Sequence, residues 1–436
     1  MKENNKNIIL FVGNVPDKYI IQTKELEKKI NRNFRIVLIA DFDTEIKLSS
    51  KYRKALSCVK RCNTENKKDI KEKLKDIKDE VLMTYFVYER YAVFYCEILK
   101  IIKLKNNPTI KSIKKSTNKM EMRKAFYKCD SNITPKFIQI KNKNSVNLIS
   151  KKVGFPCMLK PSGLSRSRLI TASNNPNELG KNLNEIFSKI EKIYKKEKIK
   201  TKPLILAEKK VEGKMYTVDV YVDNEQKIYL TPFIHQITAK DLGIDDFHIF
   251  ARVNPSGLSE KEVKKASAVV KKGVSSLGLK NVIVHFEFMK TKNGWKIIEV
   301  GPRIGAYRIE MLDMSYSIKH FENYLLLRLN KKPIIKNKLI CYSAFLEFFP
   351  QKKGYVESIT GINKIRKLES FSGIVIKNRI GSRAGLSKDG YLHTLRVILK
   401  NKNKKIFISD LKEAKNLIKI RTSKSKFLTK AIWNKA

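Results

Sequence analysis

The chain has 436 residues and a formal net charge of +50. Its length allows two or three domains with substantial cores. The lysines are spread almost evenly through runs of mixed sign, so the charge argues only weakly for a polyanion partner, and nucleic-acid binding beyond nonspecific attraction to phosphate is not expected. The six cysteines form no CxxC pair and no zinc spacing with histidine, which favours reduced thiols over a disulfide-stabilised secreted domain.

The amino-terminal sequence holds an apolar run that is too short for a signal peptide, and no segment approaches membrane-spanning length. We therefore expect a soluble, cytoplasmic protein without a membrane partner. A homodimer is compatible with the sequence.

Apolar strand patterns alternate with charged helical patterns from residue 7 to about residue 108. This alternation is typical of a small parallel α/β domain. Gly13, at the end of the first strand, does not make a dinucleotide fingerprint by itself. The expected elements are strands at residues 8–14, 34–42 and 80–87 and a helix at residues 20–30.

The rest of the chain divides into two further parts. Residues 109–333 contain an amphipathic helix at about residues 181–194 and a β-hairpin. Residues 334–436 are richer in short strands and turns, with a helix near residues 408–420. The predicted fold class is therefore mixed α/β and α+β, with domains at residues 1–108, 109–333 and 334–436, the last of them a small β-rich domain.

Two carboxylates occupy the strands of the expected hairpin at residues 282–301, which has an Asn-Gly turn. Glu287 and Glu299 would meet on one face of these largely buried strands, where an unpaired carboxylate is costly. A shared cation removes that cost, and Mg²⁺ suits oxygen ligands that act together with substrate phosphates. Arg303, in a glycine-flanked loop, could reach a phosphate. The alternative is that each glutamate pairs with a surface lysine.

Lys160 ends an expected strand and precedes a small, hydroxyl-rich loop that contains Ser165 and Ser167. A lysine beside backbone N–H groups and hydroxyls is suited to holding polyphosphate. Taken alone, a Lys-Pro pair at a strand end is more often solvated surface.

Residues 208–213 link the next two expected strands. At a hinge between two lobes, Glu208 could accept a hydrogen bond from an adenine amino group, while the backbone of Lys209 and Val211 reads the ring edge. An exposed acidic turn is the alternative.

Together these stretches resemble the ATP-grasp superfamily over roughly residues 109–333, with the expected order of elements. The resemblance implies a phosphate-binding lysine at Lys119 and a second one at Lys160. It also implies an adenine-reading linker, matched by Glu208, Lys209 and Val211.

The resemblance further implies a cluster of metal ligands and catalytic groups. Glu287 and Glu299 match the metal ligands, and Arg303 matches the arginine that meets the phosphates. Ile298 matches the apolar residue that packs under the adenine. His285 occupies a position where the family often has a polar residue facing the phosphates.

Two positions depart from the family pattern. Gly301 stands where many members have asparagine, so a second metal ion loses one ligand. Met215 stands where a ribose-binding carboxylate is common, so ribose contacts would be weaker or come from elsewhere.

The implied chemistry needs ATP and Mg²⁺, with Mn²⁺ as a possible substitute. A small carboxylate, with an amino acid favoured, attacks the γ-phosphorus to give an acyl phosphate and ADP, and an amine then displaces phosphate. Arg308 and Tyr307 could hold a substrate carboxylate. For Arg308, a structural salt bridge to Glu310 or Asp313 is an equal alternative.

Two other functions remain open. One is a biotin-carboxylase-like or carbamoyl-phosphate-type enzyme that uses bicarbonate, although the chain has neither a biotin-acceptor segment nor a glutaminase portion. The other is a non-catalytic ATP- or polyanion-binding protein. The presence of Glu287, Glu299 and Arg303 together argues against loss of catalysis.

Overall fold

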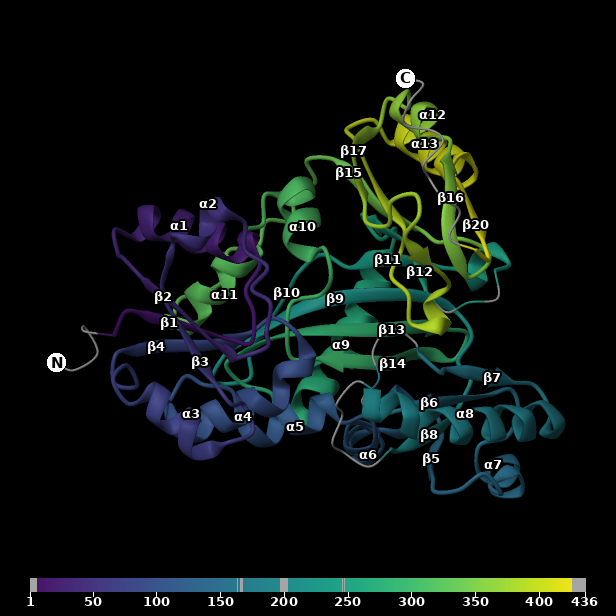
Figure 1. Ribbon diagram of the computed structural model, residues 1–436, viewed down its shortest axis with the longest axis horizontal. Helices are drawn as coiled ribbons and strands as arrows, with labels where there is room; N and C mark the ends of the chain where they lie inside the picture. Colours follow the sequence, from purple (N-terminus) through teal and green to yellow (C-terminus); the bar gives the residue numbers. More distant parts are fainter. Residues whose placement is uncertain are drawn as a thin grey trace.

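The computed structural model describes residues 6–162, 164, 168–196, 203–244, 246 and 248–425. Figure 1 shows a large central sheet, with an N-terminal unit at one end, a small lobe below its other end and a C-terminal unit above it. The mixed α/β and α+β class that the sequence predicts is confirmed.

The N-terminal unit is a four-stranded parallel sheet in the order β3-β2-β1-β4. Strand β3 was not expected from the sequence, because its pattern mixes exposed, half-buried and buried residues in a charged stretch. It forms nevertheless, as the edge strand beside the buried β2. The elements are β1 (Ile8–Val12), α1 (Asp17–Ile30), β2 (Arg35–Asp41), α2 (Ser50–Arg53), β3 (Leu56–Cys62), α3 (Lys67–Leu74), β4 (Val81–Phe86), η1 (Glu89–Tyr91) and α4 (Ala92–Ile101).

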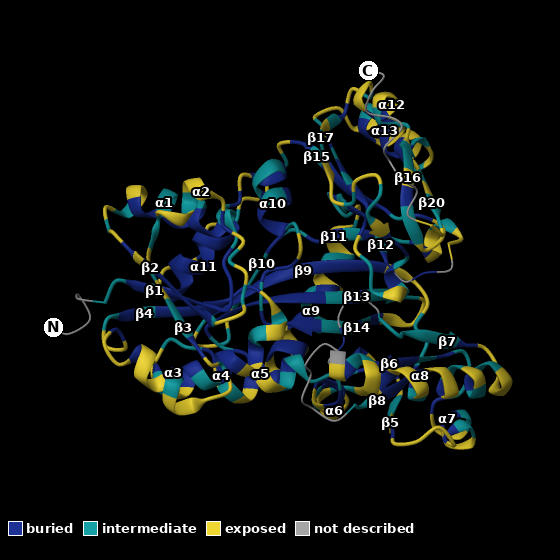
Figure 2. Ribbon diagram, in the orientation of Figure 1, coloured by how far each residue is buried: buried dark blue, intermediate teal, exposed yellow. Residues whose placement is uncertain are grey.

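The central sheet has nine strands, in the order β14-β13-β9-β11-β12-β15-β19-β17 with β10 paired to β9. The predicted hairpin is confirmed, since β13 and β14 pair in antiparallel register around a tight turn. Figure 2 shows that the inner strands are almost entirely buried. The bounds are β9 (Lys214–Val222), β10 (Ile228–Leu230), β11 (Ile234–Thr238), η3 (Lys240–Leu242), β12 (Ile249–Asn254), β13 (Val282–Thr291) and β14 (Gly294–Gly301).

Helices connect this sheet to the rest of the molecule. Helix α9 packs on α6 and on β14, and α11 packs against α1 of the N-terminal unit. Phe321 of α11 lies 4.8 Å from the ring of Tyr19, so residues assigned to the middle domain complete the core of the first one. The helices are α5 (Ile110–Thr117), α6 (Lys119–Cys129), η2 (Ser131–Ile133), α9 (Glu260–Leu277), α10 (Arg308–Tyr316) and α11 (His320–Arg328).

The small lobe is a four-stranded antiparallel sheet in the order β5-β8-β6-β7. The predicted amphipathic helix is confirmed as part of α8, whose Leu183, Ile186 and Ile190 lie in the lobe's core. The elements are β5 (Phe137–Ile140), α7 (Val146–Lys152), β6 (Cys157–Pro161), β7 (Thr171–Ser173), α8 (Pro176–Lys196) and β8 (Ile205–Lys209).

The C-terminal strands do not form one separate sheet. Strands β15, β19 and β17 continue the central sheet beyond β12, and a separate three-stranded sheet contains β16, β18 and β20. The domain boundaries at residues 108 and 333 stay predictions; both fall between elements. The elements are β15 (Tyr342–Phe348), β16 (Gly354–Thr360), α12 (Ile362–Arg366), β17 (Phe371–Ile376), β18 (Arg383–Ala384), η4 (Ser387–Asp389), β19 (Leu395–Asn401), α13 (Lys404–Leu417) and β20 (Lys419–Ser423).

Within the described part of the chain, no helix combines the length and the apolar character needed to cross a membrane.

Alanine substitutions at two helical glycines test how tightly α9 packs on the central sheet. A Cβ on Gly273 would lie 2.8 Å from Phe286 and 3.0 Å from Ile297, whereas a Cβ on Gly180 of α8 would meet only Val146, at 3.9 Å. Alanine normally stabilises a helix interior by about 1 kcal/mol relative to glycine. We expect Gly180→Ala to raise the free energy of unfolding in urea and Gly273→Ala to lower it by roughly 1–3 kcal/mol through overpacking. Equal stabilisation by both would contradict this packing.

Candidate functional site

The sheet register brings the two predicted metal ligands together. Glu287 of β13 pairs directly with Glu299 of β14, and Glu287 also pairs with Thr217 of β9. Directly paired residues project from the same face of a sheet. Both carboxylates therefore share one face, and their side chains keep exposed fractions of 27% and 39%. Like charges in this arrangement repel, so cations must lie close by.

Lys119 supplies one of these cations. Its Nζ lies 2.6 Å from Oε1 of Glu299. Lys119 is the first residue of α6, which is capped by Asn118 through hydrogen bonds from Met120 and Glu121. Burial alone would lower the pKa of Lys119, but attraction by Glu299 and Glu89 outweighs it and raises the pKa. The lysine is thus held as a cation beside the carboxylate pair.

Arg303 supplies a second cation, from the loop after β14. Its guanidinium lies 3.8 Å from Oε2 of Glu89, in η1 of the N-terminal unit. A Cβ on Gly301 would lie 3.4 Å from the same Glu89 oxygen, so this carboxylate is a neighbour of the glycine that departs from the family pattern. Burial raises the pKa of Glu89, with Glu299 and Glu287 adding to the shift and Arg303 opposing it.

A buried hydrogen-bond chain lies behind Glu287. Asp219 of β9 is fully buried and accepts hydrogen bonds from His285 Nδ1 at 2.5 Å, from His320 Nε2 at 2.7 Å and from the Gly305 amide at 2.9 Å. Burial would raise the pKa of Asp219, but the two histidines hold it well below its usual range. His285 Nε2 lies 3.5 Å from Glu287 Oε1. Asp219 therefore orients His285 so that its other nitrogen faces the carboxylate pair.

Glu208 is buried and forms ion pairs with two basic side chains. Its Oε1 accepts a hydrogen bond from Arg123 Nε at 2.6 Å, and its Oε2 accepts one from Lys160 Nζ at 2.7 Å. Burial would raise the pKa of Glu208, but Arg123 and Lys160 lower it to about 2. Both oxygens of this carboxylate thus accept hydrogen bonds from cations, and Glu208 holds Lys160 in place. A contact between Glu208 and an adenine amino group stays a prediction.

The other residues of the predicted adenine site lie near this pair. The amide of Lys209 donates to the carbonyl of Lys136 at 2.9 Å, so it is already used within the small lobe. Val211 lies in the link that follows β8, and Ile298 is half-buried on β14. Ser165 and Ser167, predicted to bind phosphate, lie outside the described residues.

The two predicted substrate-binding residues differ in their surroundings. Arg308 is 1% exposed; it donates to the Thr217 hydroxyl, and its Nε has no hydrogen-bond partner. Burial lowers its pKa to about 10. Neither Glu310 nor Asp313 pairs with it; they bind Lys18 and Lys319. Tyr307 is half-buried and donates to Glu347 Oε1 at 2.6 Å.

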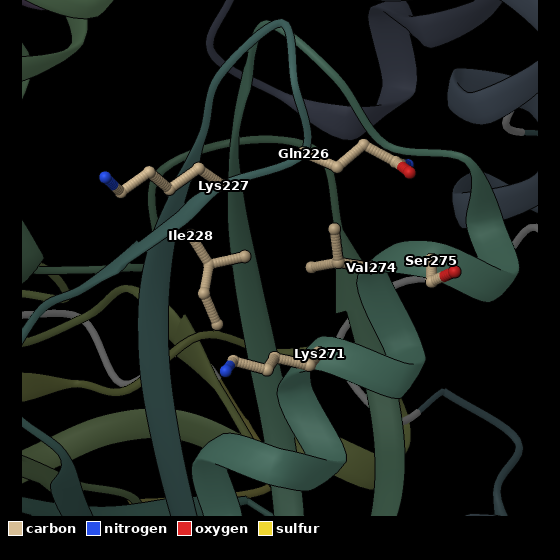
Figure 3. Close-up of a pocket in the computed structure, with 6 residues that line it drawn as sticks. All are labelled: Gln226, Lys227, Ile228, Lys271, Val274 and Ser275. Carbon is tan, nitrogen blue, oxygen red and sulfur yellow. The ribbon is translucent and has the colours of Figure 1, made fainter.

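A surface pocket of about 420 Å³ lies elsewhere, between the β9–β10 turn and α9 (Figure 3). It contains none of the predicted site residues. Its lining is Gln226, Lys227, Ile228, Lys271, Val274 and Ser275. The lining of this pocket includes no carboxylate and no histidine that could bind a metal ion. We therefore place the candidate functional site at Glu287 and Glu299 instead.

The carboxylate pair fits Mg²⁺ that arrives with a nucleotide. Among the described residues, no three His, Cys, Asp or Glu side chains form a cluster ready to hold a metal ion. Mg²⁺ needs no such cage, because it keeps several waters and binds through one or two carboxylates plus substrate phosphates. Glu287 and Glu299 would hold it, with Lys119 released from Glu299 toward the phosphates.

Three residues of the site were missed from the sequence. Asp219 is the one acidic residue of a strand that is buried at every position after the first, so the desolvation argument that selected Glu287 and Glu299 would have selected it too. Arg123 lies four residues after Lys119, on the same face of its helix. Glu89 follows the last strand of another unit, and nothing in the sequence connects it to the hairpin.

Glu208→Gln tests the buried ion pairs. Leaving Arg123 and Lys160 without a carboxylate should cost roughly 3–5 kcal/mol of unfolding free energy at neutral pH. Because the pKa of Glu208 is lowered from its ordinary 4.5 to about 2, the wild-type advantage is fully present above pH 4.5 and is lost as the pH falls towards 2. Urea unfolding from pH 7 to pH 3 measures this. Glu212→Gln, at a 72% exposed side chain, is the matched control and should show no such difference.

Comparison with known proteins identifies a domain match and a shared fold. Residues 153–310 match the family model described as an ATP-grasp domain. A curated relative, the uncharacterized protein y4rH of Sinorhizobium fredii, is 20% identical over 293 residues, which cover 66% of this chain and 58% of the relative. The chain therefore spans just over half the length of that relative.

Three solved structures share the fold. The L-amino acid ligase from Bacillus licheniformis has a TM-score of 0.72 at 14% identity, covering 96% of this chain and 100% of its own. N5-carboxyaminoimidazole ribonucleotide synthetase from Thermotoga maritima has a TM-score of 0.66 at 15% identity, with 96% and 100% covered. Biotin carboxylase from Campylobacter jejuni has a TM-score of 0.63 at 13% identity, with 96% and 93% covered. The chain therefore shares the fold of these three proteins, and its residues 153–310 match an ATP-grasp domain.

Proposed function

We propose that the chain is an ATP-dependent, ADP-forming ligase that activates a small carboxylate, with amino acids as the favoured substrates, and joins it to an amine. The observation that carries the proposal is the direct pairing of Glu287 with Glu299, with Lys119 bound to one of them and Arg303 in the adjoining loop. Solved proteins of this fold include an L-amino acid ligase and a carboxyaminoimidazole ribonucleotide synthetase, which supports the class of reaction.

In the first step, an oxygen of the substrate carboxylate attacks the γ-phosphorus of ATP, and the bond to the β-phosphate oxygen breaks to release ADP. Negative charge spreads over the transferring group, so catalysis depends on positioning and on cations. Mg²⁺, when bound, would neutralise part of this charge. Lys119 and Lys160 would meet the phosphates from α6 and β6, and Arg303 would meet them from the loop after β14.

In the second step, the amine nitrogen attacks the acyl carbon, the bond to the phosphate oxygen breaks, and the nitrogen loses a proton. No protein nucleophile is needed. His285 lies beside Glu287, with its Nδ1 bonded to Asp219 and its Nε2 3.5 Å from Glu287 Oε1. We assign it to keeping the Glu287 carboxylate in position as charge moves through the site.

Release of ADP and phosphate from MgATP tests the proposal. The purified chain is assayed with pooled amino acids, small carboxylates and bicarbonate, each with and without amines. Release that requires both an acid and an amine supports the ligase, and the pool that works names the substrate. Release with bicarbonate alone would favour a biotin-carboxylase-like activity. Saturable MgATP binding without release from any pool would contradict the ligase and favour a binding role.

Glu299→Gln should lower ADP release by more than about 100-fold, because it removes one of the two metal-binding carboxylates and the partner of Lys119. The circular dichroism spectrum should stay unchanged, since the side chain is 39% exposed. The exposed Glu225→Gln serves as the matched control. An unchanged rate in Glu299→Gln would overturn the metal assignment.

A further inference from the structure

A row of polar side chains crosses the central sheet on the face that carries the carboxylate pair. Residues that pair directly, and residues two apart on one strand, lie on the same face. The members of the row therefore follow from the strand register, from β13 through β9, β11, β12 and β15 to β19. They are Glu287, Thr217, Gln236, Arg252, Glu347 and Arg396.

The far end of this row has a positive charge without a partner. Glu347 is already satisfied by Arg252 at 2.9 Å, by His393 at 2.9 Å and by the Tyr307 hydroxyl at 2.6 Å. Arg396 forms no ion pair or hydrogen bond with any described residue. Its guanidinium instead lies 4.2 Å from the centre of the Tyr307 ring.

The surroundings of Arg396 suit binding of an anionic ligand better than a structural ion pair. Its Nε is buried without a hydrogen-bond partner, and the residue as a whole is only half-buried. Stacking on Tyr307 fixes the plane of the guanidinium, which leaves its other nitrogens free to meet an anion. Arg252 lies 5.1 Å from the centre of the same ring, so two guanidinium groups gather around Tyr307 with one carboxylate between them. A second carboxylate would balance the charge.

The middle of the row offers an acceptor. Gln236 is 2% exposed, and its Oε1 is buried without a donor in the described structure. It lies on β11, between the strand of Thr217 and the strand of Arg252. An ammonium or amine group bound here would supply the missing donor.

Arg252 is three strands and Arg396 five strands from Glu287, so their backbones lie on the order of 14 Å and 24 Å from the metal-binding strand. Their long side chains both reach the ring of Tyr307. We propose that this row is the site of the amine substrate, and that the amine carries its own carboxylate, as an amino acid or short peptide does, which Arg396 binds with Arg252 beside it. The inference rests on the proposed ligase function and names the class of its acceptor. Arg308 is buried and donates a hydrogen bond to Thr217, a member of this row.

A binding measurement tests the site without turnover. Thermal unfolding of the full chain is followed with the common L-amino acids and with their amides, which lack the carboxylate charge. Stabilisation by at least one acid over its amide, lost in Arg396→Gln and partly kept in Arg396→Lys, is the expected result. No discrimination in the wild type, or discrimination that survives in Arg396→Gln, would overturn the proposal.

A kinetic measurement separates this inference from the ligase proposal. Hydroxylamine traps an acyl phosphate without needing an acceptor carboxylate, so hydroxamate formation reports the first step alone. In Arg396→Gln, kcat/KM for a carboxylate-bearing amine should fall roughly 10- to 100-fold relative to the hydroxylamine rate. The exposed Arg421→Gln should leave that ratio unchanged. Equal loss of both rates in Arg396→Gln would overturn the acceptor site, whereas absence of hydroxamate in the wild type would instead contradict the ligase.

Discussion

The direct pairing of Glu287 with Glu299 is the constraint on which the rest of the site depends. Two like charges on adjacent strands of a buried sheet are stable only with cations near them, and the hairpin itself supplies none on that face. The cations come from two directions, Lys119 from α6 and Arg303 from the loop after β14. Asp219 adds to the arrangement by holding His285, whose Nε2 lies 3.5 Å from Glu287 Oε1. Helix α6 and the β13–β14 hairpin, which are far apart in the sequence, are therefore brought together at this pair of glutamates.

Helix α6 is the element that makes this meeting possible. Its first residue reaches the carboxylate pair, and one turn later Arg123 bonds the Glu208 carboxylate of the small lobe and the carbonyl of Ile298 on the central sheet. One helix therefore sets the distance between the carboxylate pair and the Glu208–Lys160 ion pair. Its N-terminal cap fixes where it begins, so Asn118 contributes to the site without touching it.

The sequence allowed the local parts to be predicted better than their connections. The hairpin and the amphipathic helix α8 followed from patterns of period 2 and 3.6, which a short window contains. Strand β3 was missed because an edge strand need not alternate cleanly, and the continuation of the central sheet into β15 and β19 was missed because strand pairing is a long-range property. For the same reason Glu89 could not be linked to Gly301, although Lys119 and Glu299 could be placed together through a family pattern.

The single sheet from β14 to β17 has a mechanical consequence. Each strand of this sheet is hydrogen-bonded to the next, from β14 to β17. Glu299 and Arg396 therefore cannot move apart unless the backbone hydrogen bonds between two neighbouring strands break. In the proposed reaction, nucleotide exchange would therefore require movement of the small lobe, which is a separate sheet. Arg123 joins that lobe to the central sheet, with bonds to Glu208 on one side and to the Ile298 carbonyl on the other. Movement of the lobe away from the central sheet would break one of these bonds, so we expect Arg123 to slow the release of products.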